Sequence, residues 1–230
     1  MRMFPTIAVA LLIGSAAITA QAANSPESWS GLVEVNARQF DSAFLLPGAD
    51  FRPYTKVMLD EPQVAFRDNW LNSGSGSRAR TRVTEADAER ILATVSTNTT
   101  DIFAREFERA GFKVVTAAGP DVLRVRIGVV NLFVNAPDTL SAGRSRSFTT
   151  NAGEATLIME LRDSQTKALL ASVADRRQTQ GPGGQATTVS NTAEFNSLAS
   201  RWARTAASGV VALKDASPVP ETLKQGQRLK

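Results

Sequence analysis

Two long amphipathic segments constrain the fold of this chain more than any other feature. Residues 85–110 and 191–213 each carry apolar side chains at the three- and four-residue spacing of one helix face. The first segment opens with Thr84 and Asp87 in a capping-box pattern and stops at Gly111, a residue typical just beyond a helix end. Because each expected helix has a single apolar stripe, each must pack against a second layer.

The residues before and between these helices supply that layer. Residues 122–134 are expected to form a long strand, in which apolar side chains take one face while Arg124 and Arg126 take the other. From Gly128 on, the outward face turns apolar as well. Further strands are expected at residues 54–60, 112–116, 154–163 and 168–178, with a hairpin connection at residues 163–167. This order predicts an α+β fold, a two-layer sandwich in which a mostly antiparallel sheet of about five strands carries both amphipathic helices on one face.

The first 22 residues have the composition of a secretory signal peptide. A positive start at Arg2 precedes an apolar stretch from Ile7 to Ala20, and the small residues of Ala20-Gln21-Ala22 form a cleavage step. An uncleaved anchor helix is the alternative, but polar residues dilute the stretch, and a spanning helix needs about 20 apolar residues. We therefore expect residues 1–22 to be removed on export and no transmembrane segment to remain.

The rest of the chain is expected to have three parts. Residues 23–53 are typical of an irregular N-terminal arm, because prolines interrupt their scattered apolar side chains. Residues 54–214 are expected to form a single α+β domain. Residues 215–230 combine two prolines with few apolar side chains, which predicts a disordered tail.

The chain contains neither cysteine nor histidine. Without cysteine an exported protein has no disulfides, and it also lacks the lipid-attachment cysteine of a bacterial lipoprotein, so we expect it to be free in the periplasm. Without histidine, Ser-His-Asp and Cys-His catalysis and imidazole metal sites are excluded. We therefore predict no catalytic residue, no metal site and no cofactor.

Four acidic residues lie close together in the expected hairpin: Glu154, Glu160, Asp163 and Asp175. Two carboxylates about 5 to 9 Å apart could hydrolyse a glycosidic bond, which makes a glycan hydrolase one hypothesis. The alternative is a solvated sheet face, on which nearby arginines neutralise these charges: Arg162, Arg176 and Arg177. Exposed sheet positions normally carry charged side chains that are solvated and neutralised in this way, and carboxylates with shifted pKa values are rarer.

Five arginines in two polar segments are the candidate binding residues: Arg78, Arg80, Arg82, Arg144 and Arg146. The first three occupy every second position of a Gly- and Ser-rich loop at residues 72–82. Guanidinium groups bind phosphate, lipid headgroups and acidic polymers, and the net charge of +4 agrees with an anionic partner. Export and the scarcity of interleaved aromatic residues argue against nucleic acid.

Several short motifs, spread over residues 40–214, resemble one known family. They are YTKVMLD at 54–60, GFKVV at 111–115, GPDVLRV at 119–125, NAP at 135–137, GEA at 153–155, ELRDSQT at 160–166, DRR at 175–177 and WA at 202–203. Together they are similar to the bacterial domain-of-unknown-function family 3313, whose members are often exported lipoproteins. The resemblance implies an envelope location but no known reaction, so no functional residue carries over from it. This chain departs from the family pattern by lacking the lipid-attachment cysteine.

The leading hypothesis is a non-catalytic periplasmic module that binds an envelope protein or another envelope component, for example as an assembly accessory. Its expected contact surfaces are the N-terminal arm, the arginine-bearing loops and the sheet face near Val130 to Val134. The alternatives are a glycan hydrolase that uses paired carboxylates, and a protein that binds anionic lipid or polymer through the arginine loops. The sequence leaves the ligand and the oligomeric state open.

Overall fold

Two units make up the chain, and the fold described here is that of the second. A computed structural model describes residues 29–70, 84–134, 147–149, 153–179, 184–186 and 188–228. The chain divides into Met1–Ser30 and Gly31–Lys230. All of the regular elements described below belong to the second unit.

One sheet and two helices form this unit. The strands of the sheet are β1 (Val33–Val35), β2 (Ser42–Leu45), β3 (Lys56–Leu59), β4 (Gln63–Phe66), β5 (Lys113–Val114), β6 (Val122–Val134), β8 (Gly153–Asp163) and β9 (Leu169–Thr179). The helices are α2 (Glu85–Arg109) and α3 (Thr188–Asp215). A separate antiparallel pair consists of β7 (Ser147–Thr149) and β10 (Gly184–Ala186).

Strand pairing makes the sheet mixed but mostly antiparallel. The path runs β1-β2-β9-β8-β6-β3-β5, and β4 also pairs with β6. Neighbours are antiparallel from β1 as far as β6, whereas β3 is parallel to both β6 and β5, and β4 is parallel to β6. The expected α+β class with two helices is therefore confirmed, but the sheet has eight strands rather than five.

Three short strands account for the difference. β1, β2 and β4 have 3, 4 and 4 residues, too few for a two-residue alternation to stand out in the sequence. Their conformation depends on pairing with distant segments, since β2 joins β9 and β4 joins β6. The prediction of an irregular arm at residues 23–53 is therefore wrong for β1 and β2, which are paired strands at the edge of the sheet.

The C-terminal segment also differs from the disordered tail predicted at residues 215–230. After α3 the chain packs back onto the unit through Val219 and Leu223, whose side chains are 1% and 8% exposed. Further on, Gln227 forms a parallel bridge with Val35 in β1. Low apolar content favours disorder, but two buried side chains and this backbone pairing are enough to order the segment.

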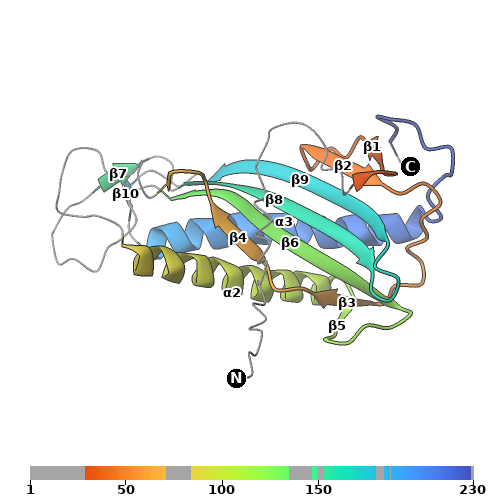
Figure 1. Cartoon of the computed structure of the whole chain (residues 1–230), viewed down its shortest axis with the longest axis horizontal. Coiled ribbons are helices and arrows are strands. Elements are labelled where there is room, and N and C mark those ends of the chain that lie inside the picture. Colours follow the sequence, from red (N-terminus) through yellow and green to blue (C-terminus); the bar gives the residue numbers. More distant parts are fainter. Residues whose placement is uncertain are drawn as a thin grey trace, which may run out of the picture. The chain divides into compact units, whose positions relative to one another are not determined.

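Both helices cover the same face of the sheet and lie side by side (Figure 1). α2 packs against β3, β4 and β5, and α3 packs against β9. The capping box of α2 is present, because the Thr84 hydroxyl accepts from the Asp87 N–H and the Asp87 carboxylate accepts from the Thr84 N–H. The core joins apolar side chains of both helices to the helix-facing side chains of the sheet, such as Leu123, Val125 and Leu157. Neither of the described helices combines the length and the apolar character that crossing a membrane requires.

Candidate functional site

The candidate carboxylates of the β8–β9 hairpin do not form a pair. Glu154 and Glu160 both lie on the face opposite the helices, but six residues of extended strand separate them by about 20 Å. Asp175 lies on the helix-covered face, where the indole N–H of Trp202 in α3 donates a hydrogen bond of 2.7 Å to its carboxylate. Glycoside hydrolysis needs two carboxyl groups about 5 to 9.5 Å apart, and here distance or the sheet itself keeps the groups apart.

Arginine side chains neutralise these carboxylates. Glu154 contacts Arg67 at 2.8 Å and Arg176 at 2.7 Å. Asp175 is 1% exposed and accepts two hydrogen bonds of 2.8 Å from Arg177. The arginine pairing expected for a structural sheet face is therefore present at Glu154 and Asp175.

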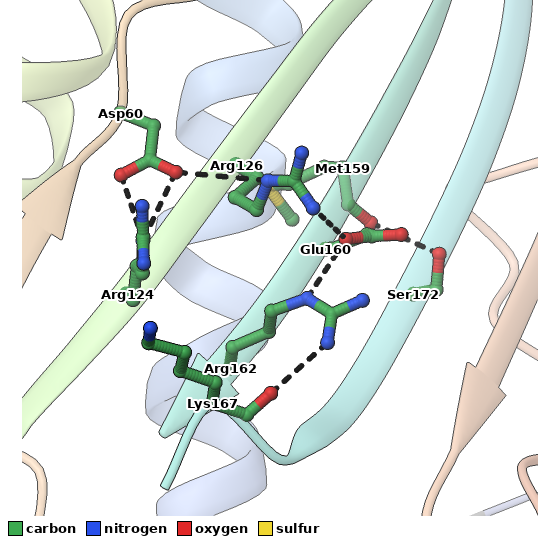
Figure 2. A network of polar contacts seen from close by, with 8 residues as sticks. All are labelled: Asp60, Arg124, Arg126, Met159, Glu160, Arg162, Lys167 and Ser172. Atoms are coloured by element: carbon green, nitrogen blue, oxygen red, sulfur yellow. Dashed lines mark hydrogen bonds and ion pairs between the residues drawn. The ribbon is translucent and has the colours of Figure 1, made fainter. Parts of the chain in front are cut away.

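Glu160 belongs to a network of charges on the face opposite the helices (Figure 2). Its carboxylate lies 3.3 Å from Arg126 and 2.9 Å from Arg162. Asp60, directly after β3, accepts two hydrogen bonds from Arg124 and lies 3.6 Å from Arg126. Three arginines thus share two carboxylates across β3, β6 and β8, and each such part-exposed pair contributes about 1 kcal/mol or less. The network links neighbouring strands of the sheet, and its arginines are already engaged.

Asp163 organises the turn between β8 and β9. Its Oδ1 accepts from the backbone N–H groups of Gln165 and Thr166, and its Oδ2 accepts from the Tyr54 hydroxyl at 2.8 Å. Burial alone would raise the pKa of Asp163, but these hydrogen bonds outweigh burial and hold the pKa below its usual value. Burial, together with the neighbouring Asp163 carboxylate, raises the pKa of Tyr54. The fourth candidate carboxylate therefore has a structural role.

The third expected contact surface, the sheet end near Val130 to Val134, is partly covered. Trp70 stacks on Phe66 with ring centroids 3.9 Å apart, and its indole N–H donates to the Val134 carbonyl oxygen at 3.2 Å. The Trp70 side chain is 4% exposed. The rings fill this end of the sheet and leave less open surface than the sequence predicts.

The arginines predicted to bind anions lie outside the described residues: Arg78, Arg80, Arg82, Arg144 and Arg146. Their role as an anion-binding surface stays a prediction. Within the part of the chain that the structure describes, no three acidic side chains gather where they could hold a metal ion.

An apolar cavity of about 260 Å³ lies between the sheet and the second half of α3. Its floor includes helix-facing side chains from β1, β2, β9 and β8, among them Ala43, Ala171 and Met159. Its roof is the face of α3 formed by Ala206, Gly209, Val210 and Leu213. These positions repeat at the spacing of one helix face, so a single side of α3 lines the cavity.

The width of the sheet explains why space remains there. Seven strands lie along the main path, and at about 4.8 Å per neighbour they span about 29 Å. Two helices whose axes are about 8–10 Å apart cover only about 20 Å. α2 covers the side of β3, β4 and β5 and α3 covers β9, while helix-facing side chains of β1 and β2 line the cavity beneath α3.

Small residues keep the cavity open, and Gly209 is the most informative of them. A Cβ atom placed on Gly209 meets nothing within 4 Å outside its own helix. A glycine inside a helix costs about 1 kcal/mol relative to alanine, and the backbone at this position does not have the positive φ that would require glycine. The chain therefore carries a small stability cost at a position where a side chain would enter the cavity.

Polar groups are confined to a few places around the cavity. Among the described residues that line it, Arg228 is the only charged one, and its side chain is exposed. The chain just before it is anchored, because the Asn36 N–H donates to the Gln227 carbonyl oxygen at 3.1 Å. Within the described part of the chain, no residue forms an ion pair or hydrogen bond with the Arg228 guanidinium. The sequence analysis missed this site because it placed Arg228 in a disordered tail. The small residues repeated along one face of α3 were visible in the sequence and could have indicated a space beside that helix.

Comparisons with known proteins place the chain in a family. Three solved structures are similar at low identity. The PelC dodecamer from Paraburkholderia phytofirmans is 11% identical, with 71% of this chain and 94% of that chain covered and a TM-score of 0.36. A Xanthomonas campestris protein of family DUF330 is 12% identical, with coverage of 80% and 92% and a TM-score of 0.41. A minor lipoprotein from Acinetobacter baumannii is 8% identical, with coverage of 68% and 94% and a TM-score of 0.32.

No curated protein matches this chain. One family model matches residues 21–206, which is most of the sequence, and it is described as a protein of unknown function, DUF3313. The resemblance seen in the short motifs is therefore confirmed, and the chain belongs to the DUF3313 family.

Proposed function

We propose that this protein is a non-catalytic binding module of the bacterial cell envelope and that it takes an apolar ligand into the cavity between the sheet and α3. The observation that carries the proposal is the cavity itself, about 260 Å³ of apolar space beside a helix glycine that the backbone does not require. Ligand sites are typically concave, mostly apolar and edged by a few polar groups, and this cavity has those properties.

A non-catalytic role is supported by the arrangement of the carboxylates. The four candidate carboxylates of the hairpin are separated by distance or by the sheet, and each is held by hydrogen bonds or ion pairs. The chain has no histidine and no cysteine to take their place. Incubation with purified cell-wall material should give no soluble glycan fragments, and turnover that disappears in Glu160→Gln would contradict this part of the proposal.

The envelope location rests on the leader-like composition of residues 1–22. Fractionation should recover the protein from the periplasm with its N-terminus at residue 23. Recovery from the cytoplasm with Met1 intact would contradict the location while leaving the binding proposal to be judged on its own measurement.

Binding is tested with a neutral fluorescent naphthylamine probe, titrated into protein purified after export. We expect saturable binding of one probe per chain, in the apolar cavity beneath α3. At a concentration of 100 times Kd, the probe should stabilise the protein by about 2.7 kcal/mol, which raises Tm by about 5–10 °C for a chain of this size. Absence of saturable binding would overturn the proposed function.

A further inference from the structure

The cavity has room for one short aliphatic chain. A methylene group is close in size to a water molecule, whose share of liquid volume is about 30 Å³. The 260 Å³ of the cavity therefore accommodates about eight or nine such groups. Two acyl chains of a phospholipid would need several times this space.

The residues of the walls favour an alkyl chain over a polar ligand. Floor and roof present methyl and methylene groups from residues such as Ala171, Met159 and Val210. A hydroxyl or amide group buried against these walls would lose its hydrogen bonds to water without replacement, which is unfavourable. The buried part of the ligand is thus a hydrocarbon.

The positive charge beside the cavity indicates the chemistry of the ligand's head group. Arg228 is exposed, and no described residue pairs with it. The neighbouring Gln227 is bridged to Val35 in the cavity wall, so the backbone that carries Arg228 is held next to the site. A guanidinium group binds carboxylates and phosphates through parallel N–H···O bonds.

We infer that the cavity binds a single-chain anionic amphiphile, with eight or nine carbons of its alkyl chain against Gly209 and its carboxylate head on Arg228. This inference rests on the proposed function and adds the chemical class of the ligand. A longer chain binds with its remaining carbons outside the cavity.

The first test is a chain-length series. Straight-chain carboxylates of four to fourteen carbons are titrated by calorimetry below their micelle concentrations. Each methylene should strengthen binding about fourfold until about eight or nine carbons, after which Kd should level off. Affinity that keeps rising through fourteen carbons would indicate adsorption to an open surface and would overturn the inference.

Two variants at Gly209 test whether the chain lies in the cavity. Both improve helix propensity, so they should fold, but a leucine side chain takes the space of about four methylene groups while alanine takes about one. In Gly209→Leu the levelling point should move from about nine carbons to about five, and in Gly209→Ala it should move by about one. An unchanged levelling point in Gly209→Leu would overturn the assignment of the chain to this cavity.

The head group is tested at a chain length of eight carbons. Octanoate should bind up to about fivefold more tightly than octanol, as expected for a solvent-exposed ion pair, and octyltrimethylammonium should bind more weakly than octanol. Arg228→Gln should abolish the preference for the carboxylate. The control Arg105→Gln removes an exposed charge from α2, away from the cavity lining, and should leave the preference unchanged.

The outcomes separate this inference from the proposed function. If octanol binds as tightly as octanoate and Arg228→Gln has no effect, the anionic head is wrong while the apolar cavity stands. If neither the alkyl compounds nor the neutral naphthylamine probe binds, the proposed function fails as well. If the protein dimerises and Gly209→Leu dissociates the dimer, the cavity receives a second copy of the chain and the inference is overturned.

Discussion

The helix-covered face of the sheet is packed differently beneath α2 and beneath the second half of α3. Beneath α2, large rings fill the interface, since Phe103 and Phe107 are fully buried and Phe107 packs edge-to-face on Phe112 with centroids 5.8 Å apart. Beneath the second half of α3, small residues such as Ala171 and Gly209 face one another across a cavity. The packing beneath α2 contributes most to stability. Beneath the second half of α3 a space remains that larger side chains would fill if stability were the only requirement.

The largest expected effect tests the packed region. Phe107→Ala should lower the free energy of unfolding by about 3–5 kcal/mol, because the ring is fully buried and leaves a cavity behind. Denaturant unfolding followed by circular dichroism measures the change. The matched variant Leu213→Ala, in the cavity wall, should cost about 1 kcal/mol, since that side chain is part-exposed and already borders empty space. Equal losses at the two positions would contradict the division into two regions.

A second pair of variants compares added volume on a single helix. Ala203 in α3 is fully buried, and Ala203→Leu should destabilise the protein by about 1–3 kcal/mol through overpacking. Six residues further along the helix, Gly209→Leu adds more atoms but should not destabilise the protein, since its Cβ enters open space. If Ala203→Leu and Gly209→Leu lower the denaturation midpoint by the same amount, Gly209 has no more free space than Ala203, and the cavity is closed in solution.

A smaller effect is expected from a single methyl group. Gly209→Ala should raise the free energy of unfolding by about 0.5–1 kcal/mol, because alanine lowers the entropy of the unfolded chain and the site has room for it. Differential scanning calorimetry should show a higher Tm. A lower Tm would indicate that the empty space is needed for folding rather than for a ligand.

The smallest effect concerns acid, at the turn between β8 and β9. The pKa of Asp163 is lowered in the folded state, by hydrogen bonds that outweigh the effect of burial. The resulting stabilisation is therefore present above the unfolded pKa of about 3.9 and is lost as pH falls through the lower folded pKa. Asp163→Asn should be less stable than the native chain near neutral pH. The difference between the two free energies of unfolding should narrow as the pH falls below about 5. A gap that is constant with pH would contradict the role of the Asp163 charge.

The helices and strands that could be predicted are those whose own residues carry a clear sequence pattern. α2 was predicted from its capping box and stripe, and β6 from the alternation around Arg124 and Arg126. β1, β2 and β4 were missed because three or four residues carry too little pattern and because pairing with distant strands fixes their conformation. The C-terminal segment was missed for the related reason that Val219 and Leu223 are isolated apolar residues in the sequence.

The candidate site was harder to predict than the fold, because a cavity is space between elements. Pairing of the hairpin carboxylates with arginine could be anticipated from the alternation along β8 and β9. The structure places Glu160 and Asp175 on opposite faces of the sheet, which the sequence analysis did not anticipate when it grouped the four acidic residues. The cavity depends on how many strands two helices can cover, and that number could not be known while the edge strands were unrecognised.

The most direct test of the account is a titration of the neutral naphthylamine probe into the native chain, Gly209→Ala and Gly209→Leu, with unfolding measured on the same samples. We expect one saturable site in the native chain, weaker binding in Gly209→Ala and the weakest binding in Gly209→Leu, while both variants are at least as stable as the native chain. Undiminished binding in a folded Gly209→Leu would show that the space between the sheet and α3 is not where ligands bind.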